Sequence, residues 1–490
     1  MEWILIVITG LLAGAIGVWL LVQKVWFKRE RIQDPPKGMT DCLPGIPRVT
    51  PSPHSRDDFD LIGAAGSLHQ FLSLYHAKHG PIFQFRWSNG PVVSVASPEG
   101  FRELRRLYDR PPELFKLFEP LIGEGSIQFA NGEIAKRRRK AYNHCFTAST
   151  IRRHYLPHFQ SQIHSPHIRA FLNSEEPFCL HTLCMRLSLG AVIDTLFMGQ
   201  LTGDQSQRFS EAYELVWNTL EARLTGILHT EENQFEQHLD WVKETIAELV
   251  QRCRSSGLGS TSSCGDSSDS SSAFSQEALA PFLTTVVGTD ILSERERSDE
   301  LITMIVGGSH TTGNLLFWLI YYLLLGPAER VARVEAELGD FHPDQSAIPV
   351  FTKACLDETM RMSVLAPWAA RFSDKEEVVL GKSIPAHVPI IMALGVELHD
   401  PSVWGADWDQ FRPERFLDGN KPAGYAFSPF GFAGGRVCPG HTFALTEATI
   451  LLSNILKDYS LSLHSTTPVS IRHGLVTSPA DPFLIHSLPR

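Results

Sequence analysis

Residues 302–325, ITMIVGGSHTTGNLLFWLIYYLLL, are apolar on nearly every side of a helix. Such a helix must be buried all round, so the rest of the chain has to pack about it. The small and hydroxylated residues 307–312 interrupt the apolar run, although these residue types weaken a helix. They indicate a groove where a diatomic ligand lies beside the helix and a hydroxyl passes it protons. The alternative is that Thr311 only bonds back to the carbonyl four residues earlier.

A glycine-rich loop, FSPFGFAGGRVCPGHTFALTEATILLS, leads Cys438 into an apolar helix near the C-terminus. A thiolate is a soft metal ligand, and glycines give the backbone freedom that close approach to a flat cofactor requires. Gly434 and Gly440 flank the cysteine, and Arg436 is placed to pair with a carboxylate at the cofactor edge. The alternative is an ordinary thiol in a turn.

Composition limits the classes of partner and compartment. The chain has 490 residues, enough for an extensive core, and a net charge of −10. This charge argues against nucleic acid as a partner, because binding to phosphates needs a basic surface. The eight cysteines form no CxxC pair, which indicates free thiols in a reducing compartment.

The N-terminus predicts a membrane anchor. Residues 3–22 carry no charge and, as a helix, would span roughly 30 Å, about one hydrocarbon core. Lys24, Lys28 and Arg29 follow the span, so the bulk of the chain should stay in the cytosol. We expect a single-pass signal anchor over residues 1–23 and a basic, proline-rich linker over residues 24–55. A cleaved signal peptide and a buried helix are the alternatives.

The remaining residues, 56–490, are expected to form one globular domain. Helical periodicity dominates from about residue 103 to residue 338, except for a serine-rich stretch, 255–272, that should be a mobile loop. Alternating residues around Ser88-Asn89-Gly90 predict a hairpin, residues 376–394 read as a meander, and two late strands end the chain. The predicted fold class is mainly α with small β-sheets (α+β).

Two further motifs carry charge. In ETMR, Glu358 and Arg361 share one helical face, and Arg415 follows in FRPERF. On a surface such a pair contributes a few tenths of a kcal/mol, whereas a buried triad would fix how two segments dock. The stretch NGEIAKRRRKAYNHCF predicts a basic helix, whose ordinary explanation is a solvated face.

Taken together, the motifs GGSHTT, ETMR, FRPERF and CPGHTFALTE stand in the order found in microsomal cytochromes P450, which the chain resembles over essentially its full length. Within that superfamily it most resembles the orphan family 20, on GSLHQFLSLYHAKHGP, ALGVELHDPSVW and the cysteine loop. The resemblance implies the cytochrome P450 fold with an N-terminal transmembrane helix, heme b as cofactor, and a place in the endoplasmic reticulum membrane with the catalytic domain facing the cytosol.

The resemblance also implies a role for each matching residue. Cys438 becomes the axial ligand of the heme iron, in a cofactor-binding loop that includes Phe430, Gly434 and Gly440. The heme propionates would be held by arginines, namely Arg139, Arg371 and Arg436. Thr311 would aid oxygen activation together with His310. The structural triad would be Glu358, Arg361 and Arg415. Substrate would contact three segments, 114–127, 364–370 and 474–477.

The implied activity is that of a heme-thiolate monooxygenase, which inserts one atom of O2 into a small apolar substrate such as a lipid, sterol or xenobiotic. Electrons would come from NADPH through NADPH-cytochrome P450 reductase, with cytochrome b5 as an optional second donor, and membrane lipid would be a partner. Two alternatives stay open: a reductase-independent heme isomerase or dehydratase, and a membrane heme-binding or sensing protein with little turnover.

Three positions depart from the family pattern. Gly431 stands seven residues before the cysteine, where a phenylalanine is usual, so the loop carries one extra residue. His310 replaces the acid that usually precedes the distal threonine, so protons must arrive through His310, Thr311 and water, or less efficiently. Ala135 replaces a tryptophan that commonly supports a propionate, which leaves heme retention more dependent on arginine.

Overall fold

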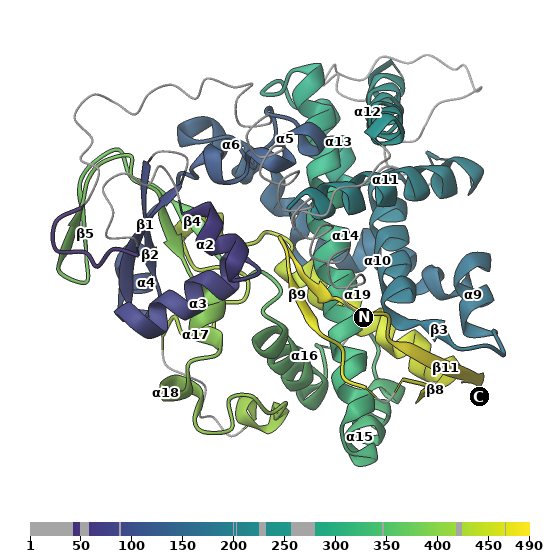
Figure 1. Ribbon diagram of the computed structural model, residues 1–490. Helices are drawn as coiled ribbons and strands as arrows, with labels where there is room; N and C mark the ends of the chain where they lie inside the picture. The colour runs from purple at the N-terminus through teal and green to yellow at the C-terminus, as the bar shows by residue number, and fades with distance from the viewer. Residues whose placement is uncertain are drawn as a thin grey trace, which may run out of the picture.

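A computed structural model describes residues 43–49, 58–87, 90–198, 200–201, 203–224, 232–255, 280–344, 347–417, 424–465 and 467–490. The predicted anchor at 1–23, most of the linker at 24–55 and the predicted serine-rich loop beyond Ser255 lie outside these residues. The described part is mainly helical with small sheets gathered to one side and at the C-terminus (Figure 1), which confirms the predicted fold class.

The helices have the following bounds: α2 Phe59–Ala64, α3 Leu68–His79, α4 Pro98–Leu104, η1 Pro112–Leu114, η2 Lys116–Phe118, α5 Glu119–Ile122, α6 Gly132–Tyr142, η3 Asn143–Phe146, α7 Ala148–Thr150, η4 Ile151–Tyr155, α8 Leu156–Ser161, η5 Gln162–His164, α9 Pro166–Leu172, α10 Leu180–Phe197, α11 Gly203–Leu224, α12 Glu232–Ser255, α13 Pro281–Gly288, α14 Glu294–Leu325, α15 Ala328–Gly339, α16 Val350–Ser363, α17 Leu394–Leu398, α18 Pro401–Trp404, η7 Pro413–Phe416, η8 Gly434–Arg436 and α19 His441–Asp458.

The strands are β1 Ile82–Trp87, β2 Gly90–Val95, β3 Phe178–Cys179, β4 Ala369–Arg371, β5 Glu377–Val379, β6 Lys382–Ile384, β7 Ile390–Met392, β8 Tyr459–Leu463, β9 Ile471–His473, β10 Thr477–Pro479 and β11 Leu484–Pro489. They form sheets in the orders β1-β2-β7-β4, β3-β11-β8, β10-β9 and β5-β6. Trp87 pairs with Gly90 in β1 and β2, so the predicted hairpin is present.

Helix α14 is the central helix that the apolar run predicts. It begins with a capping box, in which the Ser293 side chain accepts from the Glu296 amide and the Glu296 side chain accepts from the Ser293 amide. Along its length it packs against α10, α12, α16 and α19. The two helices approach closely at Gly313, where a Cβ would lie 2.7 Å from Met185 Sδ and 3.2 Å from Met185 Cα. The absence of a side chain at this position favours the close crossing.

The core divides along α14. Its first half packs with α11, α12 and α13, around residues such as Ile305. Its second half packs with α10, α16, α19 and β11, around Trp318, whose indole N–H donates to the carbonyl of Thr477 over 3.2 Å. α14 therefore holds the helical layer and the C-terminal strands together.

Residues 43–49, within the predicted linker, pack against β1. The Val49 amide donates to the Gln84 carbonyl (3.0 Å) and the Gln84 amide donates to the Pro47 carbonyl (2.7 Å). The Gln84 side-chain amide adds hydrogen bonds of 2.8 Å to the carbonyls of Leu43 and Ile46. This short segment therefore covers the side of β1 that faces away from β2.

The predicted meander at 376–394 differs from the structure in its last strand. β5 and β6 form a hairpin through Leu380 and Gly381, which both have positive φ. β7 instead leaves the hairpin and pairs in parallel with β2. Pro385 cannot donate to a ladder and His387 has φ 64°, so the chain turns between the two strands.

Among the described residues, α10 is the one helix whose length and apolar composition would suit a membrane span, and 67% of it is buried inside the protein. Its apolar character is explained by its contact with α14, which makes it a core helix.

Candidate active site

The loop before α19 presents Cys438 at the centre of the candidate site. The Cys438 amide donates to the carbonyl of Phe430 over 2.9 Å, which closes the loop. Gly431 has φ 77°, a conformation that a residue with a side chain rarely adopts. Phe430 packs into the α14–α19 core, whereas Phe432 stacks on Phe101 at 4.8 Å. Gly431 therefore takes up the extra residue, with one phenylalanine on each side.

Two opposing effects act on the pKa of the Cys438 thiol. Burial raises its pKa, while the Gly440 N–H and the positive charges of Arg139 and Arg110 favour the thiolate. A Cβ at Gly440 would lie 3.9 Å from Cys438 Sγ. The loop thus supplies the kind of donors that stabilise a coordinated sulfur.

Four arginines from different segments converge beside this loop: Arg110 before η1, Arg139 of α6, Arg371 of β4 and Arg436 of η8. Burial together with the charges of the other three lowers the pKa of Arg110 well below its usual value. Burial and Arg436 lower the pKa of Arg371 to about 10. Four cations so close together are unfavourable unless an anion joins them.

No carboxylate in the described part of the chain forms an ion pair with any of the four. Arg139 donates to the carbonyl of Val437 over 2.5 Å, Arg371 to that of Ala370 over 2.6 Å, and Arg436 to that of Ile127 over 3.0 Å. The Nε atom of each arginine is buried without a hydrogen-bond partner among the described residues. Such a cluster fits a buried dianion, and the two propionates of heme b meet this requirement.

Arg110 is the cluster member that sequence reasoning missed. It lies in a connecting segment with no motif, next to Tyr108, whose ring Arg436 covers at 4.5 Å. In the basic helix α6, Arg139 contacts the cysteine loop at the Val437 carbonyl. Its neighbour Arg138 points the other way and pairs with Glu296 and Glu300 of α14. α6 therefore joins the loop to the central helix.

On α14, Thr311 and Gly307 share one face. The Thr311 hydroxyl donates to the Gly307 carbonyl over 2.7 Å, the backbone contact foreseen as the simpler explanation for this threonine. A Cβ at Gly307 would meet no atom within 4 Å, so open space borders this face. The Thr311 hydroxyl oxygen can still accept a hydrogen bond from a donor located in that space.

His310 leaves the helix toward a different neighbour. Its ring stacks on Trp217 of α11, with centroids 3.6 Å apart and an angle of 17° between the planes. Burial lowers its pKa well below the usual value, and its Nε2 has no hydrogen-bond partner among the described residues. The structure does not bring the His310 ring to the Thr311 hydroxyl.

The Trp217 ring also faces Phe118 of η2, at 6.0 Å. One turn further along α11, a Cβ at Gly474 would lie 3.3 Å from Glu221 Oε1. Two of the segments expected to contact substrate, 114–127 and 474–477, thus meet the same face of α11. Burial raises the pKa of Glu221 to about 7. Neither Trp217 nor Glu221 carries a sequence signal that singles it out.

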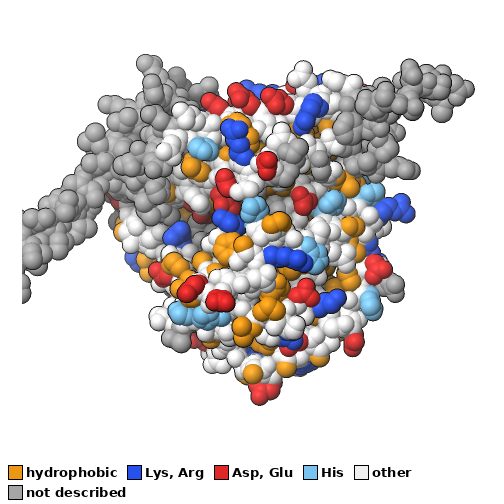
Figure 2. All heavy atoms as spheres, turned by 90° about the vertical axis from the view of Figure 1, so that its right-hand side faces the viewer, with side chains coloured by type: hydrophobic (Ala, Val, Ile, Leu, Met, Phe, Trp, Pro, Cys, Tyr) orange, Lys and Arg blue, Asp and Glu red, His pale blue; other side chains and the backbone are white. Residues whose placement is uncertain are grey.

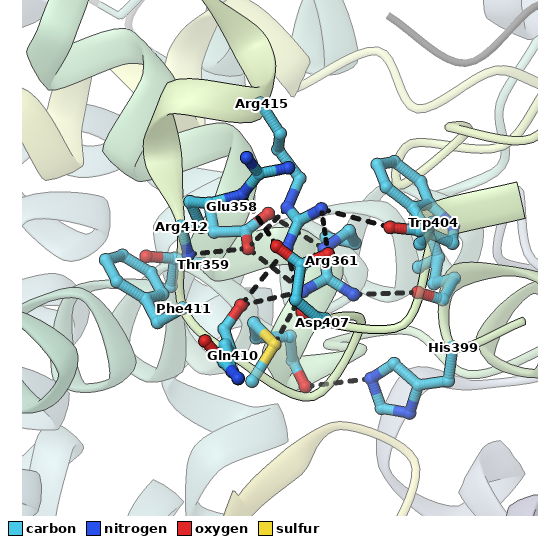
Figure 3. A network of polar contacts seen from close by, with 12 residues as sticks. Glu358, Thr359, Arg361, His399, Trp404, Asp407, Gln410, Phe411, Arg412 and Arg415 are labelled. Carbon is cyan, nitrogen blue, oxygen red and sulfur yellow. Dashed lines mark hydrogen bonds and ion pairs between the residues drawn. The ribbon is translucent and has the colours of Figure 1, made fainter. Parts of the chain in front are cut away.

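The predicted triad is assembled and buried (Figure 3). Arg361 binds Glu358 through two hydrogen bonds of 2.8 and 2.9 Å, and Arg415 Nε donates to the same carboxylate over 2.9 Å. Glu358 and Arg361 are 0% exposed and Arg415 is 7% exposed. The remaining guanidinium donors reach backbone carbonyls, including those of Leu398 and Trp404. Every charge is therefore compensated, and α16 is fixed to the segment around η7.

Comparisons with known proteins agree with this geometry. The cytochrome P450 family model matches residues 59–486. Cytochrome P450 20A1 of Mus musculus is 25% identical over 454 residues, 89% of this chain and 91% of that protein. The Rattus norvegicus protein of the same name is 26% identical over 464 residues, with the same coverage. The bifunctional cytochrome P450/NADPH–P450 reductase 2 of Bacillus subtilis (strain 168) is 35% identical over 198 residues, 39% of this chain and 18% of that protein.

These matches confirm the resemblance to cytochromes P450 and, within them, the similarity to family 20. The arginine cluster beside Cys438 suits the heme b that this family binds. The chain therefore belongs to the cytochrome P450 family of heme b monooxygenases.

Proposed function

We propose that this protein inserts one atom of O2 into a small apolar substrate, a lipid, sterol or xenobiotic, with electrons from NADPH delivered by a reductase. The observation that supports this proposal best is the set of four buried or half-buried arginines beside Cys438, none of which forms an ion pair with a carboxylate in the described part of the chain. The four arginines and the Cys438 thiolate would together hold a heme at this site.

Bound heme supplies the one-electron and oxygen chemistry, and the thiolate favours O–O cleavage. The chain's own residues do the rest. Arg110, Arg139, Arg371 and Arg436 would hold the propionates, and the Gly440 N–H would limit the charge on Cys438 Sγ. Thr311 would hold a proton donor at its hydroxyl oxygen beside Gly307. Since the His310 ring packs on Trp217, the proton would reach Thr311 through water.

The outer face of α6 is the proposed docking surface for the electron donor. Lys136, Arg137 and Lys140 are exposed there, one turn or less from Arg139 and its contact with Val437. An acidic partner would be attracted to this face. A relative in which a P450 and its NADPH reductase form one chain supports a reductase as the donor, with cytochrome b5 as a second candidate.

The proposed location rests on the sequence. The uncharged residues 3–22 and the lysines and arginines that follow them support a single-pass anchor in the endoplasmic reticulum membrane, with the heme domain in the cytosol. Apolar substrates partition into such a membrane, so the lipid would both hold the protein and supply its substrate.

The deciding experiment uses the full heme-loaded chain in lipid vesicles with NADPH-cytochrome P450 reductase, a lipid extract and 18O2. We expect products that carry one 18O atom and form only with NADPH and the reductase present. Conversion without NADPH would identify an isomerase or dehydratase. Normal heme spectra without any product would identify a binding protein.

A further inference from the structure

Two histidines meet on the C-terminal sheet, away from the candidate active site. His464 follows β8, His486 lies in β11, and His464 Nδ1 is 3.0 Å from His486 Nε2. The ring centroids are 5.0 Å apart and the rings are nearly perpendicular. Figure 2 faces the side of the molecule on which β8 and β11 lie, and histidine side chains are exposed on it.

The backbone holds both residues in place. His486 pairs with Ser462 in the antiparallel ladder of β11 and β8. The amides of His464 and Ser465 both donate to the Leu484 carbonyl, over 3.1 and 2.9 Å, and the Leu484 amide donates to Ser465 Oγ over 3.0 Å. The imidazoles are thus mounted on a rigid ladder rather than on two independent loops.

The spacing of the nitrogens suits chelation. Two imidazole nitrogens bound to one tetrahedral cation at about 2.0–2.1 Å lie roughly 3.3 Å apart, a few tenths of an ångström more than here. Each neutral ring offers one lone pair, on Nδ1 of His464 and Nε2 of His486, when its proton sits on the other nitrogen. Binding to two neutral rings therefore needs a change of tautomer and no net loss of a proton.

We propose that His464 and His486 bind a divalent cation of the imidazole-preferring class, such as Zn²⁺ or Cu²⁺. Mg²⁺ and Ca²⁺ are excluded from this proposal because they require oxygen ligands. With two protein ligands the cation keeps positions for water. The described residues contain no group of three or more metal-ligating side chains, so this is a two-ligand surface site of modest affinity.

Such a cation would connect the two ends of the segment between His464 and His486. The two histidines are 22 residues apart and enclose β9, β10 and the turn 474–477, whose Thr477 hydroxyl donates to the Val364 carbonyl over 2.7 Å. A cation bridging the two rings ties both ends of this segment together. The link to substrate binding rests on the proposed function, in which the turn contacts substrate. The metal site itself is independent of the proposed function.

The test is calorimetric titration of the full heme-loaded chain with ZnCl2, alongside His464→Gln and His486→Gln. We expect one bound Zn²⁺ in the native protein and at least about tenfold weaker binding in each variant, since each removes one of two ligands. His167→Gln, an exposed histidine on α9, and Cys179→Ser, a half-buried thiol on β3 of the same sheet, should bind as the native protein does. MgCl2 should give no heat of binding.

Equal Zn²⁺ affinity in the native protein and both histidine variants, or no binding up to millimolar Zn²⁺, overturns the site. As a check independent of variant folding, Zn²⁺ should protect His464 and His486 of the native protein from carbethoxylation, read by mass spectrometry; unprotected histidines also overturn it. Zn²⁺ should further change the affinity for an apolar ligand read from the heme spectrum. An unchanged affinity for the apolar ligand contradicts only the coupling between the metal site and the turn. A heme spectrum that responds to no apolar ligand contradicts the proposed function and leaves the metal site intact.

Discussion

Arg139 Nη2 donates a hydrogen bond of 2.5 Å to the carbonyl oxygen of Val437, the residue directly before Cys438. The adjacent Arg138 is buried and pairs with Glu296 and Glu300 at the start of α14. Two consecutive residues of α6 therefore contact the cysteine loop and the central helix, respectively. A shift of α6 would displace both the loop before Cys438 and the start of α14.

Replacing Cys438 by serine should abolish the thiolate-type Soret shift in the carbon monoxide difference spectrum, because an alcohol is a poor donor to iron. Cys253→Ser, at a buried cysteine of α12, should keep the shift. Retention of the shift in Cys438→Ser would rule out this residue as the ligand.

Replacing Arg110 by glutamine should lower heme occupancy, because one of the four cations that would hold the propionates is lost. The check is the heme-to-protein ratio after purification and its decay in the presence of apomyoglobin as an acceptor. Arg102→Gln, at an exposed residue of α4, should behave as the native protein. Equal heme loss in all three proteins would contradict a cofactor role for Arg110.

Glu358→Gln should destabilise the fold by about 3–5 kcal/mol, because it leaves the buried Arg361 and Arg415 without their anion. Denaturant unfolding of the heme-loaded protein measures the change. Glu335→Gln removes a more exposed pair with Arg490 and should cost less than about 1 kcal/mol. Similar losses for the two variants would mean that burial adds nothing to the triad.

Thr311→Ala should raise the peroxide released per NADPH consumed in the reconstituted system, because the hydroxyl that orients the proton donor is gone. Thr303→Ala is a matched control. The Thr303 hydroxyl makes the same bond to a carbonyl four residues earlier, to Asp299 over 2.7 Å, two turns before Thr311. Equal coupling in both variants and the native protein would remove Thr311 from the proposed proton path.

The contribution of three buried or half-buried histidines to the free energy of unfolding should fall as the pH drops below about 6.5. Burial lowers the pKa of His69 to about 3 and those of His399 and His473 to about 4. In the unfolded chain imidazoles titrate near 6.5, so between these values the unfolded state binds more protons. The loss is at most about 1.4 kcal/mol per pH unit for each histidine. Urea unfolding at pH 7, 6 and 5 measures it, and His473→Gln should show a shallower pH dependence than the native protein.

The features that the sequence predicted well are those in which local spacing is enough. The apolar run over residues 302–325 predicted a buried central helix, and ETMR with FRPERF predicted a charge cluster that the structure assembles. Helix α3 has similarly local end signals: it begins after Ser67, whose side chain accepts from the Gln70 amide, and ends at Gly80 with φ 86°. Caps and turns act over a few residues, so a single sequence reveals them.

The features that escaped prediction depend on contacts between distant segments. Arg110 belongs to the arginine cluster only because β4, α6 and η8 meet its connecting segment. His310 is adjacent to Thr311 in sequence, yet a helix turns about 100° per residue, so the ring faces α11 and Trp217. Likewise, nothing in residues 376–394 shows that β7 will join β2 across nearly 300 residues of chain.

The contact of residues 43–49 with β1 bears on how this protein can be handled. β1 lies at the end of the order β1-β2-β7-β4, and an uncovered edge strand is a template for pairing with another copy of the chain. Along that edge Pro47 and Val49 hydrogen-bond the backbone of Gln84 in β1, and the Gln84 side chain donates to the Ile46 carbonyl. A truncation that removes the predicted anchor but keeps Leu43 onward preserves this cover. One that begins after Val49 uncovers the part of the edge at Gln84, while Asp58 still pairs with Arg86, and should favour aggregation.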